Sequence, residues 1–218
     1  IKNPLAIIIQ GLESLKISLS SLPDNNVFHD IIGRIMNSAE RADKIVDDLL
    51  SFSKETELFF EELNATAAVE EVLCLVEPQF EKKNIAIDRQ FFSEETLIKA
   101  DKNQIHQVFL NLLVNASEAM PDGGRIDVRI QPYQAEPDKR YVRIQFSDTG
   151  IGIPEDTIQS VFEPFFSTKT DSLKTGLGLS ISRGIIEKHL GTIDITSVAD
   201  KGTTVVIGLP AYIKKGRS

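Results

Sequence analysis

The sequence has a single cysteine, no tryptophan and no long apolar run. Cys74 cannot form an internal disulfide, which fits a reducing compartment, and its apolar helical surroundings predict a core position. No segment approaches the ~20 apolar residues that a membrane helix needs, and no signal peptide is visible. We therefore expect a chain that is soluble as given and cytoplasmic. Any membrane contact would come from parent segments outside this sequence.

An excess of positive charge is also absent. Lys and Arg total 24 against 32 Asp and Glu, so the formal net charge is -8. An acidic surface is repelled by phosphate backbones and anionic lipid, which argues against nucleic acid as a partner. The 218 residues, 41% of them hydrophobic, suffice for one large or two small domains with buried cores.

Two apolar series in residues 1–55 predict a helical hairpin. Their members recur in steps of three and four, which places them on one face of a helix. Because Pro23–Asn26 interrupts the pattern, we predict two antiparallel helices joined by a short turn. The first series is Leu5, Ile8, Leu12, Leu15, Leu19 and Leu22, and the second is Phe28, Ile32, Ile35, Ala39, Ala42, Val46 and Leu49.

A two-helix hairpin is too thin to bury its own apolar seam. Two copies can cover the seam by forming a four-helix bundle, so we predict a homodimer. The alternative is that the seam packs on the rest of this chain. We assign residues 1–58 to this helical domain and residues 61–218 to a second domain.

After a charged link at residues 54–57, the pattern changes to mixed helix and strand. Asn64 and Asp101 can each cap a helix, and alternating apolar residues predict strands from residue 85, at 126–130 and at 142–146. A helix at 179–190 and a hairpin around residues 200–202 complete the chain. The predicted fold class is α+β, with the helical hairpin followed by an α/β two-layer sandwich.

Two segments of the second domain have residues suited to a nucleotide. Asn111 and Asn115 are four residues apart, so their amides share one helical face, and such a face can hold a metal-bound nucleotide. Asp148 ends an apolar strand before Gly150 and Gly152, where its carboxylate can accept a hydrogen bond from adenine. Each segment alone has a plainer interpretation, as a solvated surface for the asparagines and a simple turn for the glycines.

Two more segments follow in the chain. Residues 162–169 are aromatic-rich and lead into a polar stretch at 170–174, although a core aromatic cluster has the same composition. Residues 175–179, Thr-Gly-Leu-Gly-Leu, place glycines at a helix start, whose unpaired backbone N–H groups suit a phosphate. Glycine-rich helix starts also occur in proteins that bind no phosphate, so the specific signal is the order of all four segments.

In this order the segments resemble the ATP-binding domain shared by histidine kinases, DNA gyrase, the Hsp90 chaperone and the MutL repair protein, the GHKL type. Residues 111–116 resemble its N box, 148–152 its G1 box, 162–166 its F box and 175–179 its G2 box. Gly202-Thr203 matches a short element near the end of the family's domain. Residues 1–6 resemble the remainder of the kinase H box, which begins His-Glu, so the resemblance spans essentially the whole chain.

The resemblance implies a role for each site residue. Asn115 would ligate Mg²⁺, Asn111 would assist at the ATP phosphates and Asp148 would bind adenine. Lys169 is implied as a phosphate contact within a lid at residues 167–175. Asn3, one turn after the acceptor histidine, is implied to support dephosphorylation of the regulator. The remaining ATP-binding positions are Gly150, Gly152, Thr175, Gly176, Leu177, Gly178, Leu179 and Thr203.

By the same resemblance, the γ-phosphoryl group of ATP passes to a histidine and then to an aspartate on a response regulator receiver domain. The acceptor would lie two positions before Ile1, and we interpret His29, His106 and His189 as ordinary surface histidines. Gyrase-type and chaperone-type relatives, which hydrolyse ATP to switch conformation, have a glutamate base where this chain has Asn111. An amide cannot accept that proton, which favours a kinase. A non-catalytic nucleotide-binding module is the third alternative.

Overall fold

The structure, a computed structural model, describes residues 2–19, 28, 30–36, 38–39, 42, 46, 58–92, 96–136, 139–166 and 175–213. The chain divides into two compact units. The first unit comprises residues 1–55 and 165–178, and the second comprises residues 56–164 and 179–218. Within the described ranges, we find no helix whose length and apolarity would let it cross a bilayer.

The first unit contains the predicted helices. α1 spans Lys2–Leu19, and residues 30–36 are also helical. Leu12, Ile32 and Ala39 of the apolar seam are buried. Four other seam residues are between 45% and 55% exposed, namely Ile8, Leu15, Phe28 and Ile35. The turn at residues 23–26 and the seam positions Leu22 and Leu49 lie outside the described residues.

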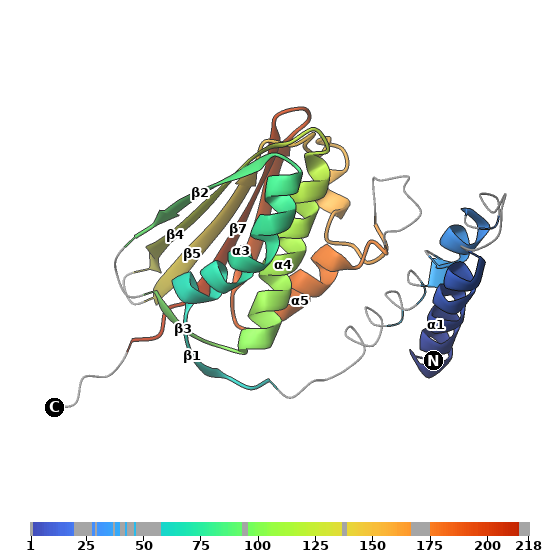
Figure 1. The fold of residues 1–218 in the computed structure, drawn as a ribbon. Coiled ribbons are helices and arrows are strands. Elements are labelled where there is room, and N and C mark those ends of the chain that lie inside the picture. The colour runs from blue at the N-terminus through green and yellow to red at the C-terminus, as the bar shows by residue number, and fades with distance from the viewer. Residues whose placement is uncertain are drawn as a thin grey trace. The chain divides into compact units, whose positions relative to one another are not determined.

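A five-stranded sheet with the order β2-β4-β5-β7-β6 organises the second unit (Figure 1). β2 is parallel to β4, and the other neighbours are antiparallel. The strands are β2 (Ile85–Phe91), β4 (Gly124–Glu136), β5 (Lys139–Asp148), β6 (Thr192–Val198) and β7 (Gly202–Pro210). Alternate residues such as Ile126, Ile144 and Ile207 are buried on one face, as the sequence pattern predicts.

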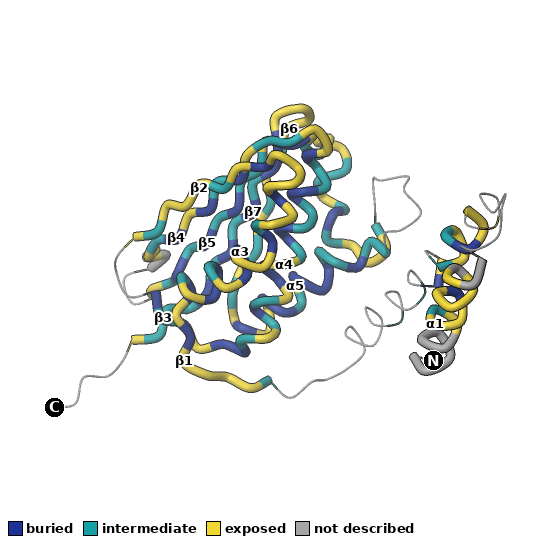
Figure 2. Tube along the Cα trace, in the orientation of Figure 1, coloured by how far each residue is buried: buried dark blue, intermediate teal, exposed yellow. Residues whose placement is uncertain are grey.

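Three helices lie on that face of the sheet, α3 (Ala65–Lys82), α4 (Lys102–Ala119) and α5 (Gly178–Lys188) (Figures 1 and 2). The predicted caps are present. Asn64 Oδ1 accepts the N–H of Ala67 at 3.0 Å, and Asp101 Oδ1 accepts the N–H of Gln104 at 3.1 Å. Helices on one side and a sheet on the other make a two-layer sandwich, so the predicted α+β class is confirmed.

The sequence pattern missed a small second sheet. β1 (Glu61–Asn64) and β3 (Leu97–Ala100) form an antiparallel pair beside the start of α3. Each strand has only four residues, which is too short for apolar alternation to reveal it. A short 3₁₀ helix, η1 (Ile158–Ser160), was not predicted either.

The prediction that Cys74 fills the core is wrong, because its side chain is exposed. Val72, Leu73 and Val76 are the buried residues of this part of α3. Cys74 and Leu75 fall on the other side of the helix, where Leu75 is 69% exposed. The apolar run is therefore wider than the face that the helix buries.

The prediction that His189 lies on the surface is also wrong, since it is 3% exposed. Its Nε2 accepts the N–H of Asp101 at 2.9 Å, and its Nδ1 lies 2.8 Å from the carbonyl oxygen of Ile185. A carbonyl can only accept, so Nδ1 donates and the ring connects α4 to the end of α5. The ring of Phe60 packs against it, with 5.1 Å between the centroids.

The remaining histidines are His29 and His106. His29 lies outside the described residues. His106 is half-buried on α4, with Nε2 3.3 Å from a carboxylate oxygen of Glu71. Burial lowers the pKa of His106, although the charge of Glu71 opposes this and that of Lys102 adds to it. His106 is therefore less solvated than an ordinary surface histidine.

Candidate functional site

Asn111 and Asn115 share one face of α4, one turn apart, as their spacing predicts. Both are half-buried, whereas Leu112, Leu113 and Ala116 are buried and fix the rotation of the helix. Asn111 Nδ2 donates a hydrogen bond to Ser182 Oγ on α5 at 2.9 Å. In the described part of the chain, no group forms a hydrogen bond with the side chain of Asn115. This face therefore presents an amide oxygen suited to a cation.

The carboxylate of Asp148 is fixed at the end of β5. Its Oδ1 accepts the backbone N–H of Gly150 at 2.8 Å and that of Thr203 at 3.2 Å. An ionised carboxylate has about four acceptor sites, so it can accept several donors at once. The structure thus brings together three predicted site residues from two segments that are far apart in the sequence.

The loop after Asp148 packs tightly against two other elements. A Cβ at Gly150 would lie 2.6 Å from the carbonyl oxygen of Ala119, at the end of α4. At Gly152, where φ is 66°, a Cβ would lie 2.1 Å from the carbonyl oxygen of Val198. Side chains at either position would force the backbone apart. The two glycines therefore place this loop between α4 and the end of β6.

Gly202 brings the start of β7 against Asp148. Its φ is 107°, and a Cβ would lie only 1.9 Å from the carbonyl oxygen of Asp148. The next residue is Thr203, whose N–H reaches the carboxylate. The short element that the sequence predicted at Gly202-Thr203 therefore serves the geometry of Asp148.

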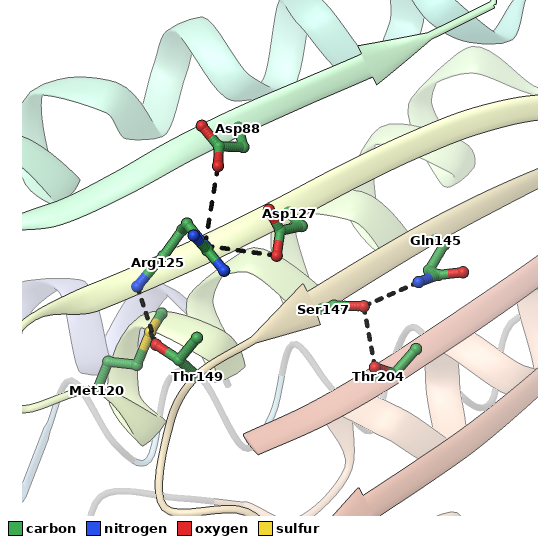
Figure 3. A network of polar contacts seen from close by, with 8 residues as sticks. All are labelled: Asp88, Met120, Arg125, Asp127, Gln145, Ser147, Thr149 and Thr204. Carbon is green, nitrogen blue, oxygen red and sulfur yellow. Dashed lines mark hydrogen bonds and ion pairs between the residues drawn. The ribbon is translucent and has the colours of Figure 1, made fainter. Parts of the chain in front are cut away.

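Thr149 fixes the strand end that carries Asp148 (Figure 3). Its N–H donates to the carbonyl oxygen of Arg125 at 3.1 Å, and its Oγ1 accepts the N–H of Arg125 at 3.0 Å. The Arg125 side chain lies 3.8 Å from Asp88 and 3.5 Å from Asp127. These exposed ion pairs add little stability. One backbone bond and one bond to the Thr149 hydroxyl are what extend the ladder between β4 and β5.

The aromatic segment is not a core cluster. Phe165 is 64% exposed and has a φ of 67°, and Phe162 is half-buried beneath the guanidinium of Arg183, 5.5 Å from its ring centroid. A Cβ at Gly176 would lie 2.5 Å from the carbonyl carbon of Phe165. The glycine segment therefore packs on the backbone of the aromatic segment.

The rest of the glycine segment leads directly into α5. Thr175 Oγ1 accepts the N–H of Leu177 at 3.3 Å, and the Leu177 side chain is buried. Gly178 and Leu179 are the first two residues of α5. The predicted helix start is therefore correct, and its N–H groups belong to the first turn.

The side chains of two predicted site residues lie outside the described part of the chain. Lys169 lies outside the described residues, together with positions 167–174 of the predicted lid. Asn3 is the second residue of α1, and its side chain also lies outside the description.

Sequence reasoning missed Ser182 and Ser197. Ser197 Oγ accepts the N–H of Ile153 and donates to the carbonyl of Gly202, both at 2.8 Å, and so joins two site loops. Serines in strands are common, so no local signal identifies this one. Ser182 carried a weak signal, since it follows Ile181 on the apolar face of a helix.

Two protein-family models match the chain. Residues 100–213 match the histidine kinase-, DNA gyrase B- and HSP90-like ATPase family, and residues 1–58 match the His Kinase A (phospho-acceptor) domain. The chain belongs to the sensor histidine kinases. The second match is to a phospho-acceptor domain of histidine kinases, and this distinguishes the chain from the gyrase B and HSP90 members of the ATPase family.

Individual kinases are similar along most of the chain. Sporulation kinase A of Bacillus subtilis is 35% identical over 211 residues, which are 96% of this chain and 33% of that protein. The catalytic domain of histidine kinase ThkA has a TM-score of 0.62 and 34% identity, and the match covers 70% of this chain and 96% of that domain.

A crystal structure of ThkA in complex with the response regulator TrrA extends the likeness to both units. Its TM-score is 0.71 at 30% identity, and the match covers 98% of this chain and 60% of that chain. The chain spans only 33% of the length of sporulation kinase A and 27% of that of sporulation kinase E.

Proposed function

We propose that this chain binds Mg-ATP and transfers the γ-phosphoryl group to a histidine, for relay to an aspartate of a response regulator. The observation that carries the proposal is the fixed carboxylate of Asp148, held by the N–H groups of Gly150 and Thr203. Its loop packs on the end of α4, the helix that presents Asn111 and Asn115. An acceptor suited to adenine and a pair of amides thus lie on elements that pack directly against each other.

The side chains present fit a hydrated magnesium ion. Mg²⁺ prefers oxygen ligands and retains several waters, so one amide oxygen suffices on the protein side. Asn115 would supply that oxygen, and Asn111 would lie at the phosphates. Bound Mg²⁺ would neutralise phosphate charge during transfer. The chain's own contribution is to hold adenine at Asp148 and the phosphates at the start of α5, which aligns the γ-phosphoryl group.

The remaining assignments extend the motif resemblance of the sequence. We propose residues 1–58 as the helical phosphotransfer domain and residues 61–218 as the ATP-binding domain, with the acceptor histidine two positions before Ile1. Lys169 would contact the phosphates from the lid at residues 167–175. A lone cysteine and the use of ATP support a cytoplasmic location.

We propose a homodimer formed through the hairpin. Ile8, Leu15, Phe28 and Ile35 are regularly spaced on the helices and remain about half exposed in one chain. A hollow of ≈ 330 Å³, lined by Ile31, Arg34, Ile35 and Ser38, lies along the second helix. A second copy would cover this apolar surface in a four-helix bundle. Light scattering should show a dimer for residues 1–218 and a monomer for residues 61–218.

The proposed protein partner is a response regulator receiver domain. The complex of ThkA with TrrA supports this choice, since its kinase resembles this chain over both units. Asn3 lies in the first turn of α1, one turn after the proposed acceptor. There its amide would orient water against the phospho-aspartate of the regulator. Asn3→Ala in a chain with His-Glu restored ahead of Ile1 should slow regulator dephosphorylation, and an unchanged rate would contradict this role.

Calorimetry of Mg-ADP binding tests the nucleotide site. Asp148→Asn replaces a charged acceptor, so affinity should fall about 10- to 100-fold, the value of one hydrogen bond to a charged group. Asp127→Asn is the matched control: Asp127 pairs with Ser147 on β5, so it lies on the face of the sheet opposite to Asp148, and affinity should be unchanged. Equal ADP affinity in the wild type and the Asp148 variant would reject the assignment.

A further inference from the structure

Ser182 is a polar residue on the buried face of α5. It is 1% exposed, and its helix neighbours Ile181, Ile185 and Ile186 are buried as well. Burying a hydroxyl group is unfavourable unless it is hydrogen-bonded, so an alanine or a valine would suit the packing better. The Ser182 oxygen accepts a hydrogen bond from Asn111 Nδ2 at 2.9 Å. This bond joins α5 to the asparagine face of α4.

The bond also determines which way the Asn111 amide faces. A side-chain amide has a donor end and an acceptor end, so directing Nδ2 at Ser182 turns Oδ1 away from α5. A serine inside a helix commonly donates its own proton to the carbonyl one turn earlier. Its oxygen then serves as an acceptor. A flipped amide would bring two acceptor oxygens together, which is unfavourable.

We propose that Ser182 is a positioning residue that holds Asn111 with Oδ1 facing the metal-nucleotide, where it accepts a hydrogen bond from a water on the magnesium ion. The inference rests on the proposed function, because it specifies how Asn111 serves Mg-ATP. Magnesium-bound water can only donate, so an amide in the opposite orientation would offer it a second donor. Ser182 itself acts only through Asn111.

The first test is a double-mutant cycle in the 218-residue chain, measured by calorimetry of ADP with Mg²⁺ and with EDTA. Ser182→Ala should weaken Mg-ADP binding by about three- to tenfold, as expected for one hydrogen bond, and leave metal-free ADP binding unchanged. In an Asn111→Ala background, Ser182→Ala should have no further effect. Gly184→Ala is the matched control, since Gly184 lies inside α5 with open space around it, and should bind like the wild type.

A second readout needs no nucleotide. In the wild-type chain, the Asn111 side-chain NH₂ protons should exchange slowly with water in ¹⁵N-resolved NMR spectra, because one of them is bonded to Ser182. Ser182→Ala should accelerate that exchange, whereas Gly184→Ala should not. A purely structural role would change the melting temperature without changing this exchange selectively.

The outcomes separate the inference from the proposed function. Wild-type affinity in Ser182→Ala, equal weakening with and without Mg²⁺, or an undiminished effect in the Asn111→Ala background would each overturn the role of Ser182. Absence of any Mg-ADP binding by the wild-type chain would instead reject the proposed function, and the inference with it.

Discussion

Gly202→Ala should damage the nucleotide site and the fold together. The added methyl group would lie 1.9 Å from the carbonyl oxygen of Asp148 and 3.0 Å from Cα of Thr149, both of which are backbone atoms that cannot rotate away. A left-handed φ of 107° adds strain, which costs an L-residue about 1–2 kcal/mol. Moving the backbone to relieve the clash costs about 1–3 kcal/mol more. The expected loss of stability is therefore about 2–5 kcal/mol, or about 4–20 °C in Tm for a domain of this size.

The site should respond in the same variant. Separation of β7 from Asp148 would lengthen the hydrogen bond from Thr203, so Mg-ADP affinity should fall at temperatures where the chain is still folded. Gly184→Ala is the matched control, because Gly184 lies inside α5 with open space around it. It should raise stability by about 0.5–1 kcal/mol and leave ADP affinity unchanged. Calorimetric melting measures the stability, and ADP titration measures the affinity. Wild-type stability and affinity in Gly202→Ala would refute the packing argument.

Three other predictions concern single sites. Leu190 is 80% exposed and occupies the left-handed position after α5, with a φ of 58°, so Leu190→Gly should raise the free energy of unfolding by about 0.5–1 kcal/mol in urea titrations. Burial lowers the pKa of His106, so the unfolded state binds more protons below about pH 6.5, and wild type should lose more stability than His106→Gln as pH falls through that range. Finally, the 218-residue chain should not phosphorylate itself on histidine when incubated with Mg-ATP. Addition of His-Glu before Ile1 should produce acid-labile phosphorylation. Strong histidine phosphorylation without the addition would show that the acceptor lies elsewhere.

Features that depend on neighbouring residues could be predicted from the sequence. The caps at Asn64 and Asp101 each bind a backbone N–H three residues later, so spacing alone reveals them. The amide pair on α4 and the glycines after Asp148 are local in the same sense. Fold class followed from the change in apolar periodicity near residue 60.

Features that join distant segments could not be predicted in this way. The bond between Asp148 and Thr203 spans 55 positions, and the one between Asn111 and Ser182 spans 71. The local sequence around Thr203 or Ser182 does not specify the hydrogen-bond partner of either residue. The family resemblance predicted Thr203 as a site position without a physical reason. In the structure, the backbone N–H of Thr203 binds the carboxylate of Asp148. The prediction for Cys74 was wrong for a related reason: the apolar periodicity of a helix does not show how wide a face of that helix the sheet covers.

Asp101 joins three segments that lie far apart in the sequence. Its Oδ1 caps α4, its Oδ2 accepts the N–H of Phe59 at 3.0 Å and its own N–H donates to His189. The chain entering the ATP-binding unit, the start of α4 and the end of α5 therefore meet at this residue. α4 presents Asn111, and α5 begins at the glycine segment. One carboxylate and its own backbone N–H thus fix the chain entering this unit, the start of α4 and the end of α5.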